Sequence, residues 1–389
     1  MIVIPNMVNI SRPARSYLRK VPSYLKTSEF PLTKMDTLML ESFQTDLDVF
    51  EGVKMSDIAF LSKDLSTINL FRGCRAGCSH CMKNAVVPNP RKETVLYEDL
   101  KGFTNGLKVI SERLGFNILN GNKVINIAED SNPLETTIKG LTRNHSLVEG
   151  LKTIHKNLNI PTVISTSGWV NPRHPDYVRA SKEAQKLTRF VKQNPDAVKE
   201  VQVEINPFLE TFDYSGRMAR ALFTFLDLFK MGKAKVVYQH TKNLKKGFDA
   251  DATKEIYERI YNNLQELAGS NLEGIPELNP KKITEIKRSH WIEQAGRGKK
   301  FFSEESNNDM HNRLLNEKFR WHELSQREKD NYLLNNTRKC VDIDGKVYCA
   351  KKTRLEYNQT PIEINLPTDI QLNYTDKTKP YKLFNEIEF

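Results

Sequence analysis

Short runs of β-branched and apolar residues alternate with longer amphipathic segments through the middle of the chain. Strand character is found at 66–71, 123–128, 161–167, 198–206 and 234–240, and a sixth strand is predicted at 282–290. Between these runs, residues 93–114, 134–158, 176–194, 216–231 and 252–268 place apolar side chains at helical spacing. Regular alternation of strand and helix predicts an α/β fold built from βαβ units with parallel strands.

The two ends of the chain lack this alternation. Residues 1–65 show no clean periodicity and contain prolines at 5, 13, 22 and 31, which break any long helix. Residues 303–335 are rich in Asn, Glu, Lys and Arg and predict a surface helix or helix pair, and turn and hairpin chemistry follows. We therefore divide the chain into an N-terminal extension (1–65), an α/β domain (66–300) and a C-terminal helical and β-hairpin extension (301–389).

Three of the five cysteines lie within eight residues, directly after the first predicted strand. They are Cys74, Cys78 and Cys81, at C-x3-C-x2-C spacing in the segment 70–83. Thiolates at this spacing can converge on three irons of a [4Fe–4S] cluster, because Gly77 and the other small residues between them let the backbone curl. The fourth iron is then left without a protein ligand, which indicates that another molecule binds there.

This loop and its position resemble the radical S-adenosylmethionine (SAM) enzymes. In that family the loop follows the first strand of a partial (β/α) barrel, SAM chelates the open iron, and an aromatic residue usually precedes the third cysteine, where this chain has His80. The resemblance implies a partial (β/α)6 barrel with a [4Fe–4S] cluster and SAM as cofactors. It also implies one-electron cleavage of SAM to a 5′-deoxyadenosyl radical, with an electron donor of the flavodoxin or ferredoxin type.

In parallel α/β folds, ligands bind beyond the carboxyl ends of the strands. After the second strand the family has a Gly-Gly-Glu-Pro-like turn that holds the ammonium of SAM, and this chain has Asp130, Ser131 and Asn132 before Pro133. Neither glycine is present. The resemblance implies that these polar residues bind SAM, and an acidic turn that caps a helix is the alternative.

Further polar residues follow the third and fourth strands. Ser165 and Ser167 lie in a turn similar to the Thr-Asn-Gly turn of the family and are predicted to reach the carboxylate or ribose of SAM; solvent-facing hydroxyls are the alternative. Glu204 and Asn206 lie two positions apart and so share one face of the fourth strand, where we expect a binding role. Gln239, His240, Arg288 and His290 lie near later strand ends, and structural roles are expected for the two histidines.

The other two cysteines, Cys340 and Cys349, flank a hairpin signal at Asp344-Gly345. A two-residue turn there pairs Cys340 directly opposite Cys349, with Cβ atoms about 4.5–5.5 Å apart on one face. Three interpretations stay open: ligands of an auxiliary cluster, as in the extensions of some radical SAM peptide maturases, a disulfide, or a reduced cross-strand pair.

Composition narrows the class of protein. Hydrophobic content of 39% and charged content of 28% fit a soluble globular chain, and no run approaches roughly 18 apolar residues, so no membrane span is predicted. The clustered cysteines favour a reducing compartment, and we expect a cytoplasmic protein. Arg12, Arg15, Arg19, Lys20 and Lys26 precede the first acidic residue and resemble a transit peptide in composition, but we interpret them as a basic arm.

Lys and Arg exceed Asp and Glu by 59 − 48 = 11, so the chain is expected to attract polyanions or acidic peptides. We predict a radical SAM enzyme that abstracts hydrogen from a peptide or protein, with nucleic acid or a small metabolite as alternative substrates. The competing hypothesis is a zinc-stabilised, non-catalytic protein that binds nucleic acid. Its fourth zinc ligand would come from Cys340 or Cys349.

Overall fold

The computed structural model describes the α/β region and part of the C-terminal segment. The described residues are 48–50, 52–53, 57–58, 61, 65–73, 93–114, 124–127, 132–168, 177–205, 214–240, 250–280, 289–291, 325, 338–354 and 361–375. The sequence prediction for 303–335 thus lies outside the described residues, apart from Ser325.

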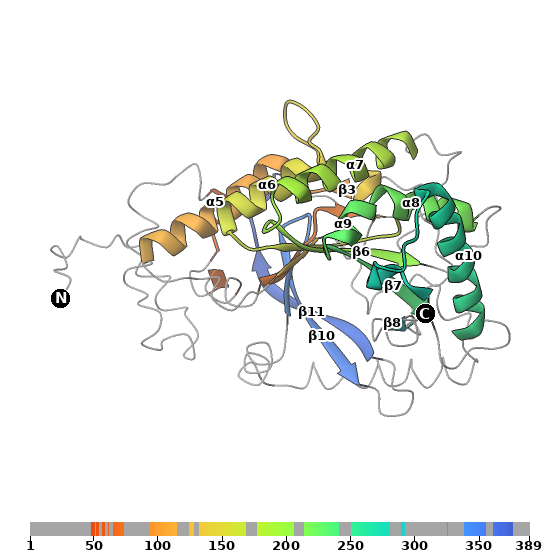
Figure 1. Ribbon diagram of the computed structural model, residues 1–389. Coiled ribbons are helices and arrows are strands. Elements are labelled where there is room, and N and C mark those ends of the chain that lie inside the picture. Colours follow the sequence, from red (N-terminus) through yellow and green to blue (C-terminus); the bar gives the residue numbers. More distant parts are fainter. Residues whose placement is uncertain are drawn as a thin grey trace, which may run out of the picture.

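A nine-stranded, mainly parallel sheet forms the centre of the protein, in the order β11-β10-β9-β1-β4-β5-β6-β7-β8 (Figure 1). The strands are β1 (Leu65–Ile68), β4 (Ile125–Ile127), β5 (Thr162–Thr166), β6 (Val198–Ile205), β7 (Ala234–His240), β8 (Ser289–Trp291), β9 (Arg338–Val341), β10 (Lys346–Arg354) and β11 (Pro361–Gln371). From β1 to β8 the neighbours follow chain order and pair in parallel. This confirms the predicted α/β fold, and β8 lies at the end of the predicted sixth strand.

Helices alternate with these strands. They are α5 (Tyr97–Leu114), α6 (Leu147–Leu158), α7 (Tyr177–Gln193), α8 (Tyr214–Thr224), α9 (Leu226–Lys230) and α10 (Ala250–Ala268), with short 3₁₀ turns η2 (Asp48–Phe50), η3 (Pro133–Glu135) and η4 (Pro276–Leu278). Crossovers between neighbouring parallel strands share one hand, so a consecutive strand order places the helices on one face. Figure 1 shows α5, α6 and α7 side by side on that face. We call the other side of the sheet the open face.

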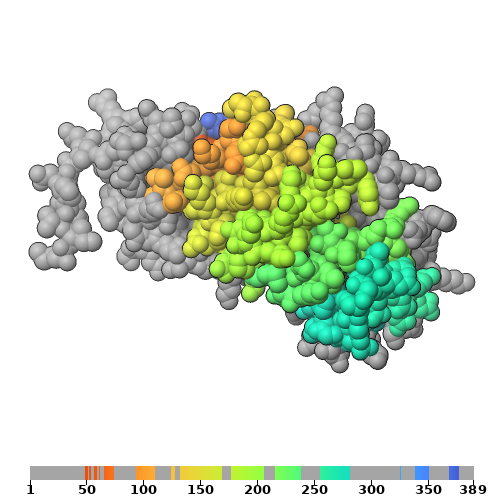
Figure 2. Space-filling model, turned by 45° about the horizontal axis from the view of Figure 1, so that its top comes forward, coloured from red at the N-terminus to blue at the C-terminus, as the bar shows by residue number. Residues whose placement is uncertain are grey.

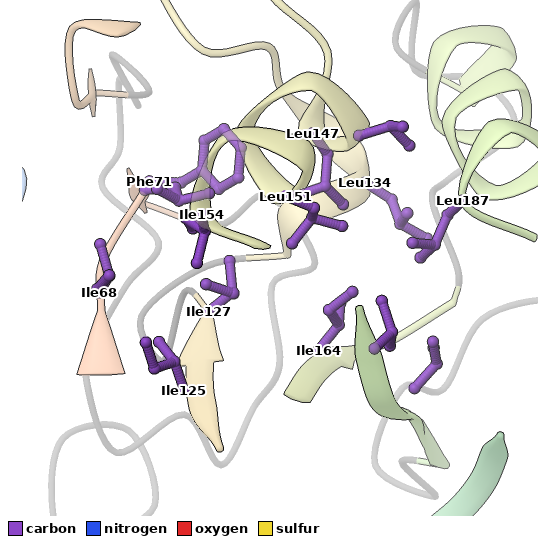
Figure 3. Packing of buried hydrophobic residues seen from close by; sticks show 14 of the residues in the cluster. Ile68, Phe71, Ile125, Ile127, Leu134, Leu147, Leu151, Ile154, Ile164 and Leu187 are labelled. Carbon is purple, nitrogen blue, oxygen red and sulfur yellow. The ribbon is translucent and has the colours of Figure 1, made fainter. Parts of the chain in front are cut away.

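The core lies between the sheet and the helices. Ile125, Ile127 and Ile164 point from β4 and β5 toward Leu151 of α6 and Leu187 of α7 (Figure 3). All five are at most 2% exposed. Burial of each such side chain stabilises the fold by about 1.5–3 kcal/mol. The runs of β-branched residues therefore mark the strands that form this core.

The predicted helix 134–158 is wrong in its first half. Residues 136–146 instead form a non-helical loop, in which Ile138 and His145 pair as an isolated antiparallel bridge. Helix α6 begins only after Ser146, whose hydroxyl accepts the N–H of Glu149 (3.3 Å) while the Glu149 carboxylate accepts the N–H of Ser146 (2.8 Å). This capping box stabilises a helix start at Leu147, and the sequence reading missed it.

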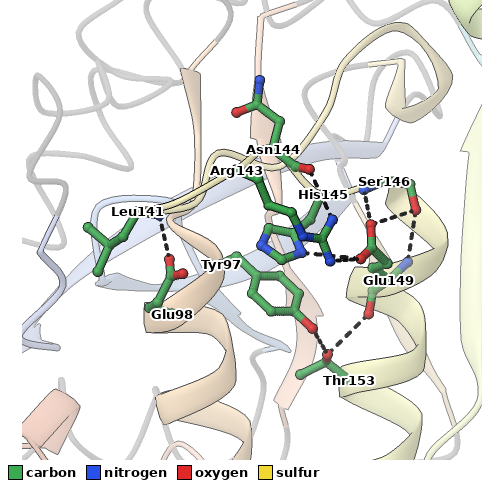
Figure 4. A network of polar contacts seen from close by, with 9 residues as sticks. All are labelled: Tyr97, Glu98, Leu141, Arg143, Asn144, His145, Ser146, Glu149 and Thr153. Atoms are coloured by element: carbon green, nitrogen blue, oxygen red, sulfur yellow. Dashed lines mark hydrogen bonds and ion pairs between the residues drawn. The ribbon is translucent and has the colours of Figure 1, made fainter.

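The loop 136–146 is held against α5 and α6 by the contacts in Figure 4. The rings of Tyr97 and His145 stack with centroids 3.6 Å apart, and the Tyr97 hydroxyl lies 2.8 Å from Thr153 Oγ1. Arg143 forms an ion pair with Glu149. Because this pair outweighs burial, the pKa of Glu149 falls to about 2.

The predicted helix 216–231 is divided at Phe225, which is fully buried between α8 and α9. Among the described residues, no helix has the length and apolar character that a membrane crossing requires.

The C-terminal hairpin continues the main sheet, because β9 pairs in parallel with β1. Its predicted register is wrong by one residue. Val341 is opposite Val347 and Cys340 is opposite Tyr348, while Cys349 is opposite Lys339. The loop has three residues instead of two, closed by the bond from Asp342 N–H to the Lys346 carbonyl (2.9 Å), with Gly345 at φ +80°.

This register separates the two cysteines. A shift of one residue moves a side chain to the other face of a sheet, so Cys340 and Cys349 lie on opposite faces. Cys349 belongs to the hydrophobic core, and Cys340 is buried opposite Thr67 of β1. The predicted cross-strand cysteine pair is therefore wrong, and the two residues are not joined in a disulfide.

Candidate functional site

The described residues on either side of the cysteine segment lie beside each other near the carboxyl end of β1. Asn69, directly after β1, donates its N–H to the carbonyl of Val341 in β9 (2.8 Å). The chain then forms β2 (Phe71–Arg72), which pairs antiparallel with β3 (Glu93–Thr94). The residues that flank segment 74–92 are thereby held side by side. The predicted ligands Cys74, Cys78 and Cys81, and His80, lie outside the described residues.

Arg72 is the centre of a group of charges at this neck of the loop. Its Nη2 lies 2.5 Å from Oδ2 of Asp342 and 3.7 Å from Oδ2 of Asp344, and its Nη1 lies 3.3 Å from Oε2 of Glu93. The side chains of Asp342 and Asp344 are only 3% and 4% exposed. Burial opposes the charge of Arg72, but the three carboxylates outweigh it and raise the pKa of the guanidinium. We call these four residues the neck cluster.

The hairpin turn presents its two aspartates to Arg72 in a fixed geometry. Oδ1 of Asp342 accepts the N–H of Ile343 (2.8 Å), and Oδ1 of Asp344 accepts the N–H of Lys346 (3.1 Å). Tyr374 lies beside them: its pKa is raised far above the usual value by burial and then by Asp99, Asp342 and Asp344. The turn between β9 and β10 therefore holds Arg72 in place. Arg72 lies two residues before Cys74 and is far from the turn in sequence.

The open face carries a polar ladder across β5, β6 and β7. Val201, Val203 and Ile205 of β6 belong to the core, so the alternate residues of that strand point to the open face. There Ser165 Oγ donates to Gln202 Oε1 (3.0 Å), and Gln202 Nε2 donates to Glu200 Oε1 (2.6 Å). Lys235 Nζ lies 2.7 Å from Glu200 Oε2. Ser165, predicted to reach SAM, is thus part of this ladder.

Glu204 continues the same row at the carboxyl end of β6, opposite Val237 of β7. Part of its surface stays accessible, yet protein atoms surround the carboxyl group, and this desolvation raises its pKa. A carboxyl group at a strand end, on the open face, fits the position predicted for it. Its neighbour in the prediction, Asn206, lies outside the described residues.

Asn132 joins the carboxyl ends of β4 and β5. Its side chain is 3% exposed, its Oδ1 accepts the hydroxyl of Thr166 (2.6 Å), and its Nδ2 donates to Ser167 Oγ (2.9 Å) and Glu135 Oε1 (3.0 Å). Both amide hydrogens of Asn132 are used in this way. A ligand could therefore bind this side chain only through the second lone pair of Oδ1. The structure thus brings together Asn132 and Ser167, two of the residues predicted to bind SAM.

The remaining predicted residues are only partly placed. Asp130, Ser131 and Arg288 lie outside the described residues. Gln239 of β7 is the register partner of His290 in β8, and His240 is that of Trp291. Both histidines therefore lie in neighbouring strands at the edge of the sheet.

Sequence reasoning missed the neck cluster. Arg72 follows Leu70 and Phe71, and Asp342 and Asp344 lie at the start and in the middle of the hairpin turn, but both features are ordinary in isolation. Their meeting depends on the pairing of β1 with β9, for which the sequence carries no local signal.

No group of three or more metal-ligating side chains occurs among the described residues. In comparisons with known proteins, no family model and no curated protein matches the chain.

Proposed function

We propose that the chain is a radical SAM enzyme with a partial (β/α)6 barrel, in which Cys74, Cys78 and Cys81 hold a [4Fe–4S] cluster. The observation that carries the proposal is the position of the three-cysteine segment. It follows the first of six parallel strands that are neighbours in chain order, and the short strands on either side of it, β2 and β3, pair with each other just beyond the carboxyl end of β1. Ligands of such sheets bind at that edge.

The donor set fits the group. Three thiolates are the ligands that iron–sulfur clusters take, and one iron stays open for SAM. With the cluster held by the three cysteines and SAM bound, the site would supply one-electron reductive cleavage of SAM, the electron coming from the external flavodoxin- or ferredoxin-type donor, and hence hydrogen abstraction from the substrate. The chain's own residues bind and orient: Asn132 and Ser167 lie at the ends of β4 and β5, and Glu204 lies at the end of β6.

The observed register counts against structural zinc. Cys349, one of the two candidates for the fourth ligand, is packed in the hydrophobic core, and Cys340 lies within the sheet opposite Thr67. The same register removes the paired cysteines that favoured a maturase-like peptide substrate. We keep a peptide or protein as the proposed substrate, and the positive net charge of the chain is the observation that still supports it.

Anaerobic reconstitution of the full chain with iron and sulfide tests this function. We expect a brown protein with absorption near 400 nm and about four irons per chain, which forms 5′-deoxyadenosine from SAM and dithionite. Cys78→Ala should lose both iron and SAM cleavage, whereas the matched variant Cys349→Ala should keep both. Colourless protein with one zinc per chain, or SAM cleavage retained in Cys78→Ala, would refute the proposal.

A further inference from the structure

The exposed ionic side chains of α6 and α7 all carry positive charge. The two helices lie side by side on the surface (Figure 2). Their exposed ionic residues are Lys152 and Lys156 of α6 and Arg179, Lys182, Lys186, Arg189 and Lys192 of α7. We call these the basic face. The acidic residues of the same helices are paired: Glu183, only 3% exposed, with Lys186, and Glu149 with Arg143.

The cations follow the axis of α7. Arg179, Lys182, Lys186 and Arg189 are spaced by three, four and three residues, which places them on one side of the helix. From Arg179 to Lys192 the row extends about 20 Å at 1.5 Å per residue. Lys152 of α6 joins the row, because its Nζ lies 5.9 Å from the ring centroid of Phe190. The basic face is therefore one elongated surface.

Internal ion pairs offset only part of this charge. Lys186 binds Glu183 (2.6 Å) and Lys192 binds Asp227 of α9 (2.7 Å). Both lysines keep about half of their side-chain surface exposed, at 51% and 48%. The basic face thus presents a row of positive charge to solvent along the whole of α7.

The residues between the cations indicate which polyanion fits. On α7, Gln185 is the exposed neutral residue within the row, Gln193 directly follows it, and Val178, 59% exposed, directly precedes it. Protein interfaces have an apolar, often aromatic centre, which the described surface of α7 lacks. Phosphate groups are bound by Lys, Arg and polar side chains without such a centre. One nucleic-acid strand carries a phosphate every 3.4 Å or so along the axis, so the row matches about six of them.

We propose that the basic face binds the sugar–phosphate backbone of a nucleic acid, independently of its sequence. Arg179 lies in the first turn of α7, the helix that follows the carboxyl end of β5, so the bound strand would run from that edge of the sheet down the outside of the helical layer. This inference does not depend on the radical SAM proposal, because none of its residues belongs to the candidate site.

Fluorescence anisotropy with the full chain tests the proposal, using a labelled oligo(U) of about 20 nucleotides and a DNA duplex of the same length. The variant Lys156→Gln/Lys182→Gln/Arg189→Gln removes three cations that take part in no ion pair described above. We expect about tenfold weaker binding and a salt slope smaller by about 2 for the single strand or about 3 for the duplex. The form that the wild-type chain binds more tightly identifies the preferred nucleic acid.

The matched control is Lys101→Gln/Lys230→Gln/Arg259→Gln, which removes three exposed cations from α5, α9 and α10. It should bind as the wild-type chain does, and both variants should keep the wild-type melting temperature. Equal weakening by the control would mean that net charge alone attracts the probe. Absence of binding, or equal competition by polyglutamate, would overturn the proposal in favour of a solvated surface or an acidic protein partner.

Discussion

Arg72 and Asp342 form an ion pair 2.5 Å long although they are 270 positions apart in the sequence. The pair joins the root of the cysteine loop to the turn of the C-terminal hairpin. It is also buried, with side chains 13% and 3% exposed, so its removal has consequences that a surface pair would not have.

Arg72→Met should lower the free energy of unfolding by about 3–5 kcal/mol, because it leaves the buried carboxylates of Asp342 and Asp344 without their counter-ion. Urea denaturation at pH 7 measures this. Arg143→Met is the matched control: Arg143 is 60% exposed and pairs with Glu149, so its loss should destabilise the fold far less than the loss of Arg72. Similar small losses in both variants would show that the neck cluster does not stabilise the fold.

Glu149→Gln should make the chain less stable at neutral pH and leave it unchanged in acid. Arg143 lowers the pKa of folded Glu149 to about 2, while the unfolded carboxyl titrates near 4.5. A lowered pKa means stability that is complete above about pH 4.5 and lost as the pH falls toward 2. Because the pair is largely exposed, we expect a difference of about 1 kcal/mol at pH 7.

Gln keeps the hydrogen bonds of the capping box, so the variant isolates the charge of Glu149. Urea titrations of both proteins between pH 2 and pH 7 should show a difference in stability that shrinks as the pH falls from about 4.5 toward 2. A difference that is independent of pH would contradict this assignment.

Gly345→Ala should destabilise the hairpin more than Gly232→Ala destabilises the end of α9. Both glycines have positive φ, +80° and +66°. A Cβ at Gly345 would lie 2.6 Å from the carbonyl oxygen of Leu372, whereas one at Gly232 has no atom within 4 Å. The backbone strain of about 1 kcal/mol is common to both, so the difference in melting temperature reports the steric clash. Equal shifts would mean that the turn moves to accommodate the methyl group.

Oxidation should not join Cys340 to Cys349. Side chains on opposite faces of a sheet point apart, and such cysteines cannot be bridged without backbone movement. Mass spectrometry of tryptic peptides after diamide treatment should find no such crosslink. In the variant Val341→Cys/Val347→Cys, whose residues are directly opposite, the engineered pair provides the positive control. A 340–349 crosslink in the native chain would support the two-residue turn after all.

The parts of the fold that depend on local sequence were predictable. The β-branched runs of β5, β6 and β7 identified these strands to within one residue, and their alternation with helices gave the parallel sheet. The start of α6 was missed because the apolar spacing continues upstream of Ser146, and only the capping box marks the boundary. The register of the hairpin was missed because Asp344-Gly345 suits both a two-residue turn and a three-residue loop with Gly at positive φ.

Long-range pairing was the part that sequence could not supply. The hydrogen bonds that place β9 beside β1 join backbone atoms, and backbone pairing leaves no residue-specific pattern. The neck cluster depends on that pairing, and so does the separation of Cys340 from Cys349. By contrast, the positions of Asn132, Ser167 and Glu204 near strand ends follow from the order of the elements alone.

The pairing of β1 with β9 also affects how the chain folds during synthesis. Ser66 and Lys339, which are joined by a hydrogen bond, are separated by 273 residues. At about 5–20 residues per second, a ribosome needs roughly 14–55 s to make that length. Through this interval one edge of β1 has no partner strand, and an open edge is where chains join one another. The nascent chain therefore exposes the strand that leads toward the cysteine segment until β9 has been made.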